Sequence, residues 1–193
     1  RLWLQMFRDD RDDMYGVDAA ILMNPKIWEA SGHVAGFSDP LVECEKCKRR
    51  FRADHLADKY TCPECGGSLG DARQFNMMFK THAGAMEDES AVVYLRPETA
   101  GGIFANFKNV VDSLHPKLPF GIAQIGKAFR NEIAPRDFIF RLRELSQMEV
   151  EYFVQPSGWE QAFEEWRKMM HLFARAIGLP EAMVHELEVE AAD

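Results

Sequence analysis

The chain has 193 residues, of which 47% are hydrophobic, and its formal net charge at pH 7 is −8. This length suits one domain with a small insertion, and the apolar fraction suffices for a sizeable core. The negative charge excludes a protein whose whole surface binds a polyanion, so an RNA partner would need a local basic patch. The sequence has neither a bilayer-spanning apolar run nor a signal peptide, which predicts a soluble, cytoplasmic protein.

The N-terminal stretch predicts a helix followed by a strand. Residues 1–13 have a helical apolar pattern. The side chains expected to face inward are Leu2, Trp3, Met6 and Phe7. Residues 17–23, VDAAILM, predict a strand that ends at Asn24-Pro25. This apolar run suits burial within one subunit and pairing across a dimer equally well.

A glycine-containing stretch comes next. Residues 30–40 include Gly32, Gly36 and Pro40, and this composition predicts a loop. His33 lies within it. A single loop histidine is more often structural than ligand-binding, and both roles stay open.

The four cysteines form two CxxC pairs with 14 residues between them. They are Cys44, Cys47, Cys62 and Cys65. Two tight turns that each offer two thiolates complete a tetrahedral site, so the spacing predicts a zinc ribbon with a structural Zn²⁺. Two disulfides would use the same residues, but short CxxC loops are strained and the chain is expected to be intracellular.

The middle of the chain predicts two short strands and a helix. The strands are residues 75–80 and 92–95, with an acidic loop at residues 85–90 between them. A helix then opens at Glu98, whose carboxylate suits the first turn of a helix. Its expected inner stripe is Ile103, Phe107, Val110, Val111 and Leu114.

Residues 120–154 predict a hairpin of two extended runs with a turn at residues 134–137. Period-2 alternation puts one set of residues of the first run on a shared face: Ile122, Gln124, Gly126, Ala128, Arg130 and Glu132. The second run contributes Arg141, Arg143, Leu145, Gln147, Glu149 and Glu151 to one face. Its opposite face is mostly apolar, with Phe140, Leu142, Met148, Val150 and Tyr152. The mixed-charge face suits either solvent or a site that binds phosphate through arginines and an ammonium group through carboxylates.

The last predicted element is an amphipathic helix. Ser157 and Glu160 have the spacing of a capping box, and Gly178 and Pro180 end the pattern. Its apolar stripe, expected in a core or an interface, is Trp159, Phe163, Trp166, Met170, Phe173 and Ile177. The acidic residues 181–193 are expected to begin another element.

Several blocks carry a resemblance to a known family. FRNE at residues 129–132, followed by FRLREL and QMEVEYFV, resembles motif 2 of class II aminoacyl-tRNA synthetases. YLRPETAGGIFANF (residues 94–107) and FRADHL (residues 51–56) narrow the resemblance to the glycyl-tRNA synthetases, in the bacterial form that is an α2 dimer. ASGHVAGFSDP (residues 30–40) and FNMMFKT (residues 75–81) fit the same family, so nearly all of the chain is covered.

The resemblance implies an α+β fold in which an antiparallel sheet carries the site on its polar face, helices cover the other face, and the zinc ribbon is inserted between strands. Residues 1–40 would hold the end of motif 1 and the start of the catalytic domain. Residues 41–70 would be the zinc ribbon. Residues 71–193 would be the catalytic core with motif 2. The intact protein would be a homodimer that joins glycine to tRNA(Gly) with ATP and Mg²⁺.

The resemblance also implies site residues. The ATP-binding set is Arg130, Asn131, Glu132, Phe140, Arg141, Leu142, Arg143, Glu144 and Leu145. The glycine-binding set is Arg52, Glu98, Leu145, Ser146, Gln147, Met148 and Glu149. Arg130 is the expected catalytic residue, in contact with the α-phosphate and the substrate carboxylate. Glu98 and Glu149 would hold the glycine ammonium group, and Glu132 would accept from the adenine amino group.

The chain departs from the family in three ways. Leu145 stands where the family usually has a phenylalanine that stacks on adenine, which puts ATP affinity in doubt. Gly101 stands where the family has glutamine, and we expect it to loosen the helix near Glu98, because glycine costs about 1 kcal/mol in a helix relative to alanine. Nothing after Val154 resembles motif 3 or an anticodon-binding domain, which predicts a fragment of a longer synthetase.

Two other functions compete with a glycine-tRNA ligase core. A zinc-ribbon RNA-binding module without catalysis would explain the cysteines but not the mixed-charge hairpin. An inactive synthetase fragment or paralogue would explain Leu145, Gly101 and the missing motif 3.

Overall fold

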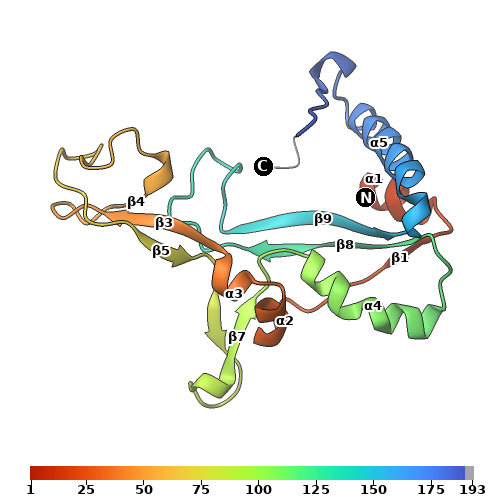
Figure 1. Ribbon diagram of the computed structural model, residues 1–193, viewed down its shortest axis with the longest axis horizontal. Helices are drawn as coiled ribbons and strands as arrows, with labels where there is room; N and C mark the ends of the chain where they lie inside the picture. The colour runs from red at the N-terminus through yellow and green to blue at the C-terminus, as the bar shows by residue number, and fades with distance from the viewer. Residues whose placement is uncertain (190–193) are drawn as a thin grey trace. The chain divides into compact units, whose positions relative to one another are not determined.

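The computed structural model describes residues 1–189 (Figure 1). Its backbone contacts divide the chain into two units, which are described separately. The first unit is formed by residues 1–16, 110–123 and those from 150 onward, and the second by residues 17–109 and 124–149. The last four residues of the tail predicted as residues 181–193 lie outside the described residues.

The first unit packs helices on one face of a small sheet. Its elements are α1 (Leu2–Leu4), the π-helical turn η1 (Gln5–Asp9), β1 (Met14–Gly16), η4 (Pro156–Gly158), α5 (Trp159–Ala176) and η5 (Glu181–Met183), with parts of β8 (Phe120–Phe129) and β9 (Glu144–Phe153). The sheet order is β1-β8-β9. β1 pairs with β8 in parallel, so this sheet is not wholly antiparallel as expected.

The core of the first unit is aromatic. Trp3 and Phe7 are buried, and the ring of Phe7 stacks on Trp166 of α5 at 5.8 Å between centroids. Tyr152 and Phe173 pack against the same cluster. The expected helix at the N-terminus is therefore confirmed as far as Asp9, although Leu2 is exposed rather than inward.

The second unit contains two antiparallel three-stranded sheets. Their strand orders are β2-β7-β6 and β4-β3-β5. The strands are β2 (Leu22–Met23), β3 (Ser38–Glu43), β4 (Arg50–Arg52), β5 (Arg73–Asn76), β6 (Lys80–His82) and β7 (Val92–Leu95). The helices are α2 (Pro25–Ala30), α3 (His33–Gly36), the short turns η2 (Ala53–His55) and η3 (Glu89–Ala91), and most of α4 (Ala100–Leu114). The single sheet predicted from the sequence is thus replaced by three smaller ones.

A buried arginine ties the second unit together. Arg96 is 2% exposed, and its guanidinium donates to the carbonyl oxygens of Lys127 at 2.6 Å and Ala19 at 2.7 Å. Gly126 leaves room for it, because a Cβ there would lie 2.2 Å from Arg96 Nη2. Burial lowers the pKa of Arg96, so its role here is structural.

Three predicted elements differ in the structure. The strand expected at residues 17–23 is wrong except for Leu22–Met23, because residues 17–21 lie outside any strand and give carbonyl groups to Arg96. The loop expected at residues 30–40 contains α3 and the start of β3. The strand expected at residues 75–80 is broken between β5 and β6.

The start of α5 also differs. Gly158 is its N-cap, without a side-chain hydrogen bond, so the predicted capping box at Ser157 is wrong. The expected stripe is only partly inward: Trp166 and Phe173 pack in the core, as does Met169, which the sequence did not single out. The other stripe residues are more than half exposed: Trp159, Phe163, Met170 and Ile177. In the described residues no helix has the length and apolar character needed to cross a membrane.

Candidate active site

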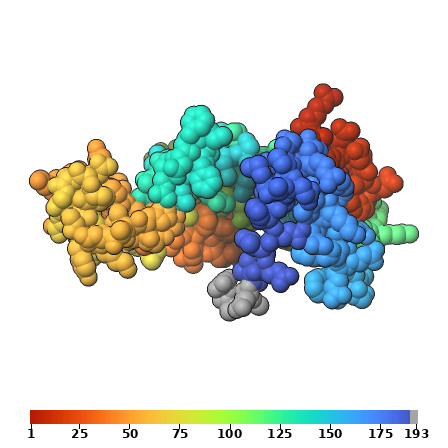
Figure 2. Space-filling model, turned by 90° about the horizontal axis from the view of Figure 1, so that it is seen from above, coloured from red at the N-terminus to blue at the C-terminus, as the bar shows by residue number. Residues whose placement is uncertain are grey.

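A pocket of about 370 Å³ lies beside the connection between β8 and β9 in the second unit. It is lined by Arg52, Met77, Arg130, Glu132, Ile139, Phe140, Arg141, Leu142 and Leu145. The connection itself, residues 130–143, stands out from the surface in teal in Figure 2. Its tip turns at Asp137 and Phe138, which both have positive φ, so the turn overlaps the predicted residues 134–137 at Asp137 and extends beyond them. Seven of the residues predicted for ATP or glycine therefore line one pocket.

A buried carboxylate pairs with one arginine of the pocket. Glu132 is 7% exposed, and Arg141 Nη1 donates to its Oε2 at 3.2 Å. This contact holds the Glu132 carboxylate in one orientation. Glu132 can thus present a fixed acceptor to a ligand.

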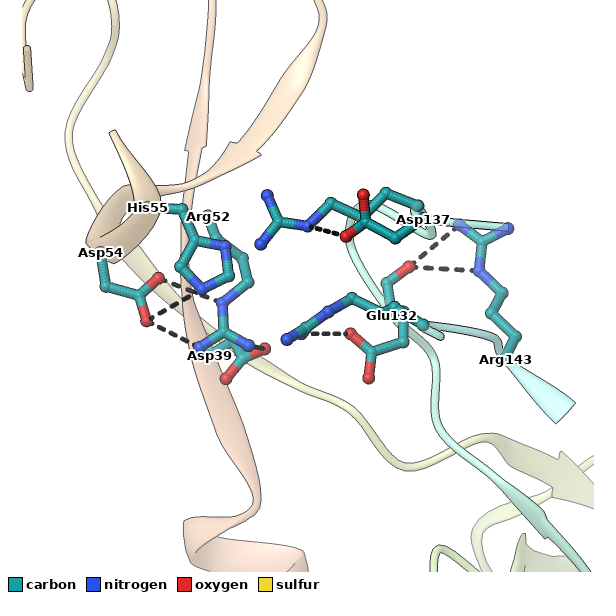
Figure 3. Close-up of polar contacts among 9 residues, drawn as sticks. Asp39, Arg52, Asp54, His55, Glu132, Asp137 and Arg143 are labelled. Atoms are coloured by element: carbon teal, nitrogen blue, oxygen red, sulfur yellow. Dashed lines mark hydrogen bonds and ion pairs between the residues drawn. The ribbon is translucent and has the colours of Figure 1, made fainter. Parts of the chain in front are cut away.

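Arg143 is used differently from Arg141. Its Nε and Nη2 donate to the backbone carbonyl of Glu132 at 3.2 and 3.0 Å (Figure 3). Arg143 and Asn131 line a separate pocket of about 310 Å³. Arg143 therefore holds the connection in shape, whereas Arg141 lines the larger pocket.

Arg52 enters the pocket from β4, between two carboxylates. Its Nη1 lies 2.6 Å from Asp39 Oδ2, and its Nη2 lies 2.7 Å from Asp54 Oδ2 (Figure 3). Asp39 is 6% exposed on β3, and burial raises its pKa, although Arg52 opposes this. The sequence did not single out Asp39, because residues 30–40 were predicted as a loop.

Arg130 is held by a carbonyl and an aromatic ring. Its Nε donates to the carbonyl oxygen of Pro97 at 3.1 Å, and its guanidinium lies 5.6 Å from the centroid of the Phe37 ring. The guanidinium has further N–H donors that can face a ligand in the pocket that Arg130 lines. Phe37 is a second residue that sequence reasoning missed.

The start of α4 lies against β9. Gln147 Oε1 accepts from the backbone N–H of Thr99 at 3.0 Å, and Thr99 Oγ1 donates to Glu149 Oε2. Glu98 contacts His33 instead, with 3.5 Å between Oε1 and Nε2. Glu98 and Glu149, the two predicted ammonium-binding carboxylates, therefore have different partners. Glu98 contacts His33, and Glu149 accepts from Thr99.

The side chains of β9 alternate between two faces. Leu145, Gln147 and Glu149 are partly buried, whereas Glu144, Ser146 and Met148 are exposed on the opposite face. Glu144 pairs there with Lys127 at 3.2 Å. The structure therefore does not bring these three side chains to the pocket, and only their backbone atoms remain available to it.

The four cysteines converge on one point. Their sulfur atoms all lie within 4.8 Å of one another. Cys44 and Cys65 are 3.5 Å apart and Cys47 and Cys62 are 3.7 Å apart, too far for disulfides. Zn–S bonds of about 2.3 Å give tetrahedral S···S edges of about 3.8 Å, so the donor set fits Zn²⁺.

The backbone around the sulfurs also suits a metal. A Cβ on Gly67 would lie 3.3 Å from the sulfur atoms of Cys44 and Cys65, so only glycine leaves them uncrowded. The pKa of Cys44 is lowered to about 6, chiefly by the backbone N–H of Cys47. This cluster lies at the ends of β3 and β4, the strands that carry Asp39 and Arg52.

Comparison with known proteins identifies the family. Residues 79–192 match the tRNA synthetase class II core domain (G, H, P, S and T). The chain belongs to this family. The α+β fold with antiparallel sheets that was predicted from the motifs is therefore confirmed.

Curated relatives of the chain are named glycine–tRNA ligases. The protein from Treponema denticola is 54% identical over 183 residues, which cover 93% of this chain and 41% of the relative. That from Acetivibrio thermocellus is 48% identical and covers 86% of this chain and 42% of the relative. That from Borreliella burgdorferi strain ZS7 is 55% identical over 81% of this chain and 36% of the relative. The chain thus spans about two fifths of the length of these relatives.

Solved structures share the fold at low sequence identity. A structure titled as the RNA binding domain of threonyl-tRNA synthetase from Cryptosporidium parvum has a TM-score of 0.58 and 16% identity, covering 91% of this chain and 34% of that one. A putative threonyl-tRNA synthetase from Aeropyrum pernix gives the same TM-score and identity, with 89% and 28% covered.

Proposed function

We propose that this chain is part of the catalytic core of a glycine-tRNA ligase, which activates glycine with ATP and then transfers it to tRNA(Gly). The observation that carries the proposal is the pocket in which Arg52, Arg130 and Arg141 meet the buried carboxylate of Glu132. Phosphate and carboxylate groups are what forked guanidinium groups bind best. The names of relatives at 48–55% identity support glycine as the amino acid.

Activation needs alignment and charge stabilisation rather than a protein nucleophile. The carboxylate of glycine attacks the α-phosphorus of ATP, and pyrophosphate leaves. Arg130, held by Pro97 and Phe37, would bridge the α-phosphate and the amino-acid carboxylate and stabilise the charge that develops on phosphorus. Glu132 would accept from the adenine amino group, and Arg141 would contact phosphate.

The pocket offers an aromatic ring on which a nucleotide base could stack. Leu145 and Phe140 both line the pocket, and the Phe140 side chain is 82% exposed. We infer that Phe140 offers the ring face that Leu145 lacks. Mg²⁺ would neutralise phosphate charge. Glu132 of the pocket and Asp39 next to it are each paired with an arginine, so phosphate oxygens would be the main ligands of Mg²⁺.

Glycine selection would depend on carboxylates that crowd a small space. Glu98 and Glu149 would hold the ammonium group, with Gln147 fixing the backbone between them at Thr99. Carboxylates that close on the ammonium group would leave little room for a side chain, so exclusion of alanine would be mainly steric.

The zinc ribbon of residues 41–70 would be a structural device for this site. One Zn²⁺ on the four cysteine thiolates would fasten the ends of β3 and β4, the strands that present Asp39 and Arg52. Residues 1–40 and 71–193 would complete the catalytic domain, with the end of motif 1 at the N-terminus. We further propose a cytoplasmic homodimer, because free thiols suit a reducing compartment and the family pairs its subunits through motif 1.

The test is calorimetric binding of a non-hydrolysable glycyl-sulfamoyl adenosine to this chain and to its Arg130→Ala and Glu98→Ala variants. Each variant should weaken binding about a hundredfold or more, as expected for loss of a buried charged contact. Arg49→Ala is a matched control, because Arg49 is exposed and pairs only at the surface with Glu64. Unchanged affinity in Arg130→Ala and Glu98→Ala would contradict the proposal. So would a chain that binds RNA but does not bind the analogue.

A further inference from the structure

One short segment contacts two residues that are predicted to bind the substrate, Glu98 and Arg130. It consists of α3 and the residue that ends it, Phe37. His33, the first residue of α3, pairs with Glu98, and Phe37 lies under the guanidinium of Arg130. The rings of His33 and Phe37 are themselves 5.4 Å apart. The predicted ammonium-binding carboxylate and the predicted phosphate-binding guanidinium therefore rest on neighbouring rings.

We propose that His33 is a positioning residue that orients Glu98 toward the glycine ammonium group, and that Phe37 positions Arg130 toward the α-phosphate and the substrate carboxylate. This inference rests on the proposed function. It concerns residues that touch the substrate-binding groups rather than the substrate.

The surroundings of His33 fix the orientation of its ring. Its side chain is 16% exposed, its edge meets the ring of Trp28 at 5.4 Å between centroids, and Ser31 Oγ lies 2.8 Å from Nδ1. An ionised carboxylate only accepts, so the nitrogen facing Glu98, Nε2, must carry a proton. Ser31 Oγ, which also donates to the carbonyl oxygen of Trp28 at 3.3 Å, contacts Nδ1, so both ring nitrogens of His33 have a polar neighbour.

The segment is also anchored through its backbone. Asn76 Nδ2 on β5 donates to the carbonyl oxygens of Val34 at 2.8 Å and His33 at 3.3 Å. The backbone N–H of Met77 donates to the carbonyl of Phe37 at 2.9 Å. Gly32 allows the sharp entry, with φ of 80°. A segment held at both ends can set the positions of the groups it contacts.

A histidine packed among aromatic rings can instead have a purely structural role, and two ligands separate the roles. Glycyl-sulfamoyl adenosine carries the ammonium group, and acetyl-sulfamoyl adenosine has the same skeleton without it. If His33 acts through Glu98, His33→Ala should weaken glycyl-analogue binding about tenfold and leave acetyl-analogue binding unchanged. A structural role would weaken both alike.

The variants sharpen this test. His33→Gln keeps a side-chain donor and should recover glycyl-analogue affinity to within about threefold of the parent. In a Glu98→Gln background, His33→Ala should have no further effect, since the two residues would act as one unit. Phe37→Leu should weaken both analogues, because Arg130 meets the acyl-sulfamoyl group that they share. His82→Ala is the control, because His82 is exposed on β6.

The outcomes separate the two proposals. A parent chain that binds neither analogue would overturn the proposed function and this inference with it. A parent chain that binds the glycyl analogue, together with a His33→Ala variant that binds both analogues as the parent does or weakens both equally, would overturn the inference alone.

Discussion

The ring of Trp28 occupies the space that a side chain at Gly101 would need: a Cβ built on Gly101 would lie 2.6 Å from Trp28 Cζ3. Trp28 is fully buried, and Gly101 is in the first turn of α4, three residues after Glu98. The glycine was expected to loosen this helix start. Close packing of a large ring against it offsets that loss, so the departure from the family pattern at position 101 has a structural partner in α2.

This packing predicts the effect of restoring a side chain. Gly101→Ala should lower the free energy of unfolding by about 1–3 kcal/mol, since overpacking a filled core outweighs the gain in helix propensity. Thermal unfolding followed by circular dichroism measures this. Gly36→Ala is the matched control, because nothing lies within 4 Å of a Cβ there, and it should be neutral or slightly stabilising. A Gly101→Ala variant as stable as the Gly36 control would contradict the assignment.

Removal of zinc should affect the substrate pocket at a distance. Chelation, or Cys62→Ser, releases the ends of β3 and β4 and with them Asp39 and Arg52. We expect the melting temperature to fall by about 10 °C or more and adenylate-analogue affinity to fall about tenfold. Metal analysis should find one zinc per chain. A purified chain with no bound metal and the same affinity before and after chelation would contradict this.

The two arginines of the connection should separate ligand binding from stability. Arg141→Lys keeps a charge beside Glu132 but loses the fork for phosphate, so ATP affinity should fall about tenfold with little change in melting temperature. Arg143→Lys cannot make both bonds to the Glu132 carbonyl, so the melting temperature should fall by about 3 °C while ATP affinity is largely kept. The reverse pattern would show that Arg143 is the phosphate ligand.

Tyr152 predicts a pH dependence of stability in the first unit. Burial, followed by the hydrogen bond that it donates to Asp13, raises its pKa to about 12. Because the folded state holds the proton more tightly, the stabilisation is complete below pH 10 and is lost as the pH rises to about 12. Tyr152→Phe should be about 1.5 kcal/mol less stable than the parent at pH 8, and the difference should narrow above pH 10.

Urea unfolding at pH 8, 10 and 11 measures that difference. Tyr60→Phe is the control, because Tyr60 is 81% exposed and should show no such narrowing. A Tyr152 difference that stays constant with pH would mean that the hydroxyl is not protected in the folded state.

Local sequence patterns predicted the helices and strands whose residues have a clear periodicity. The strand at residues 92–95, the helix through residue 114 and the alternation along β9 agree with the structure because each has a clear period, although Leu114, expected in the inner stripe of the helix, is 52% exposed. The cysteine cluster followed from spacing alone. The pocket residues around Arg130 followed from the motif 2 resemblance, since its order along the chain brings them to one connection.

The sequence predictions that were wrong depend on tertiary contacts. VDAAILM has strand propensity, but the carbonyl oxygens of Ala19 and Ile21 accept hydrogen bonds from Arg96. No local sequence pattern predicts these bonds. Asp39 was missed because Gly36 and Pro40 suggested a loop, whereas Asp39 pairs with Phe75 of β5. Which face of α5 is inward depends on Phe7, a residue far away in sequence. Each of these features is decided by a residue that is distant in the sequence and close in the structure, so the local pattern alone could not predict it.

The central claim is that this chain belongs to an enzyme that activates glycine. The most direct measurement is amino-acid-dependent exchange of labelled pyrophosphate into ATP by the intact protein. Exchange should depend on glycine, should be at least about a hundredfold slower with alanine, and should be lost in Arg130→Ala but kept in Arg49→Ala. Exchange that proceeds equally with alanine, that persists in Arg130→Ala, or that does not occur with glycine would contradict the account.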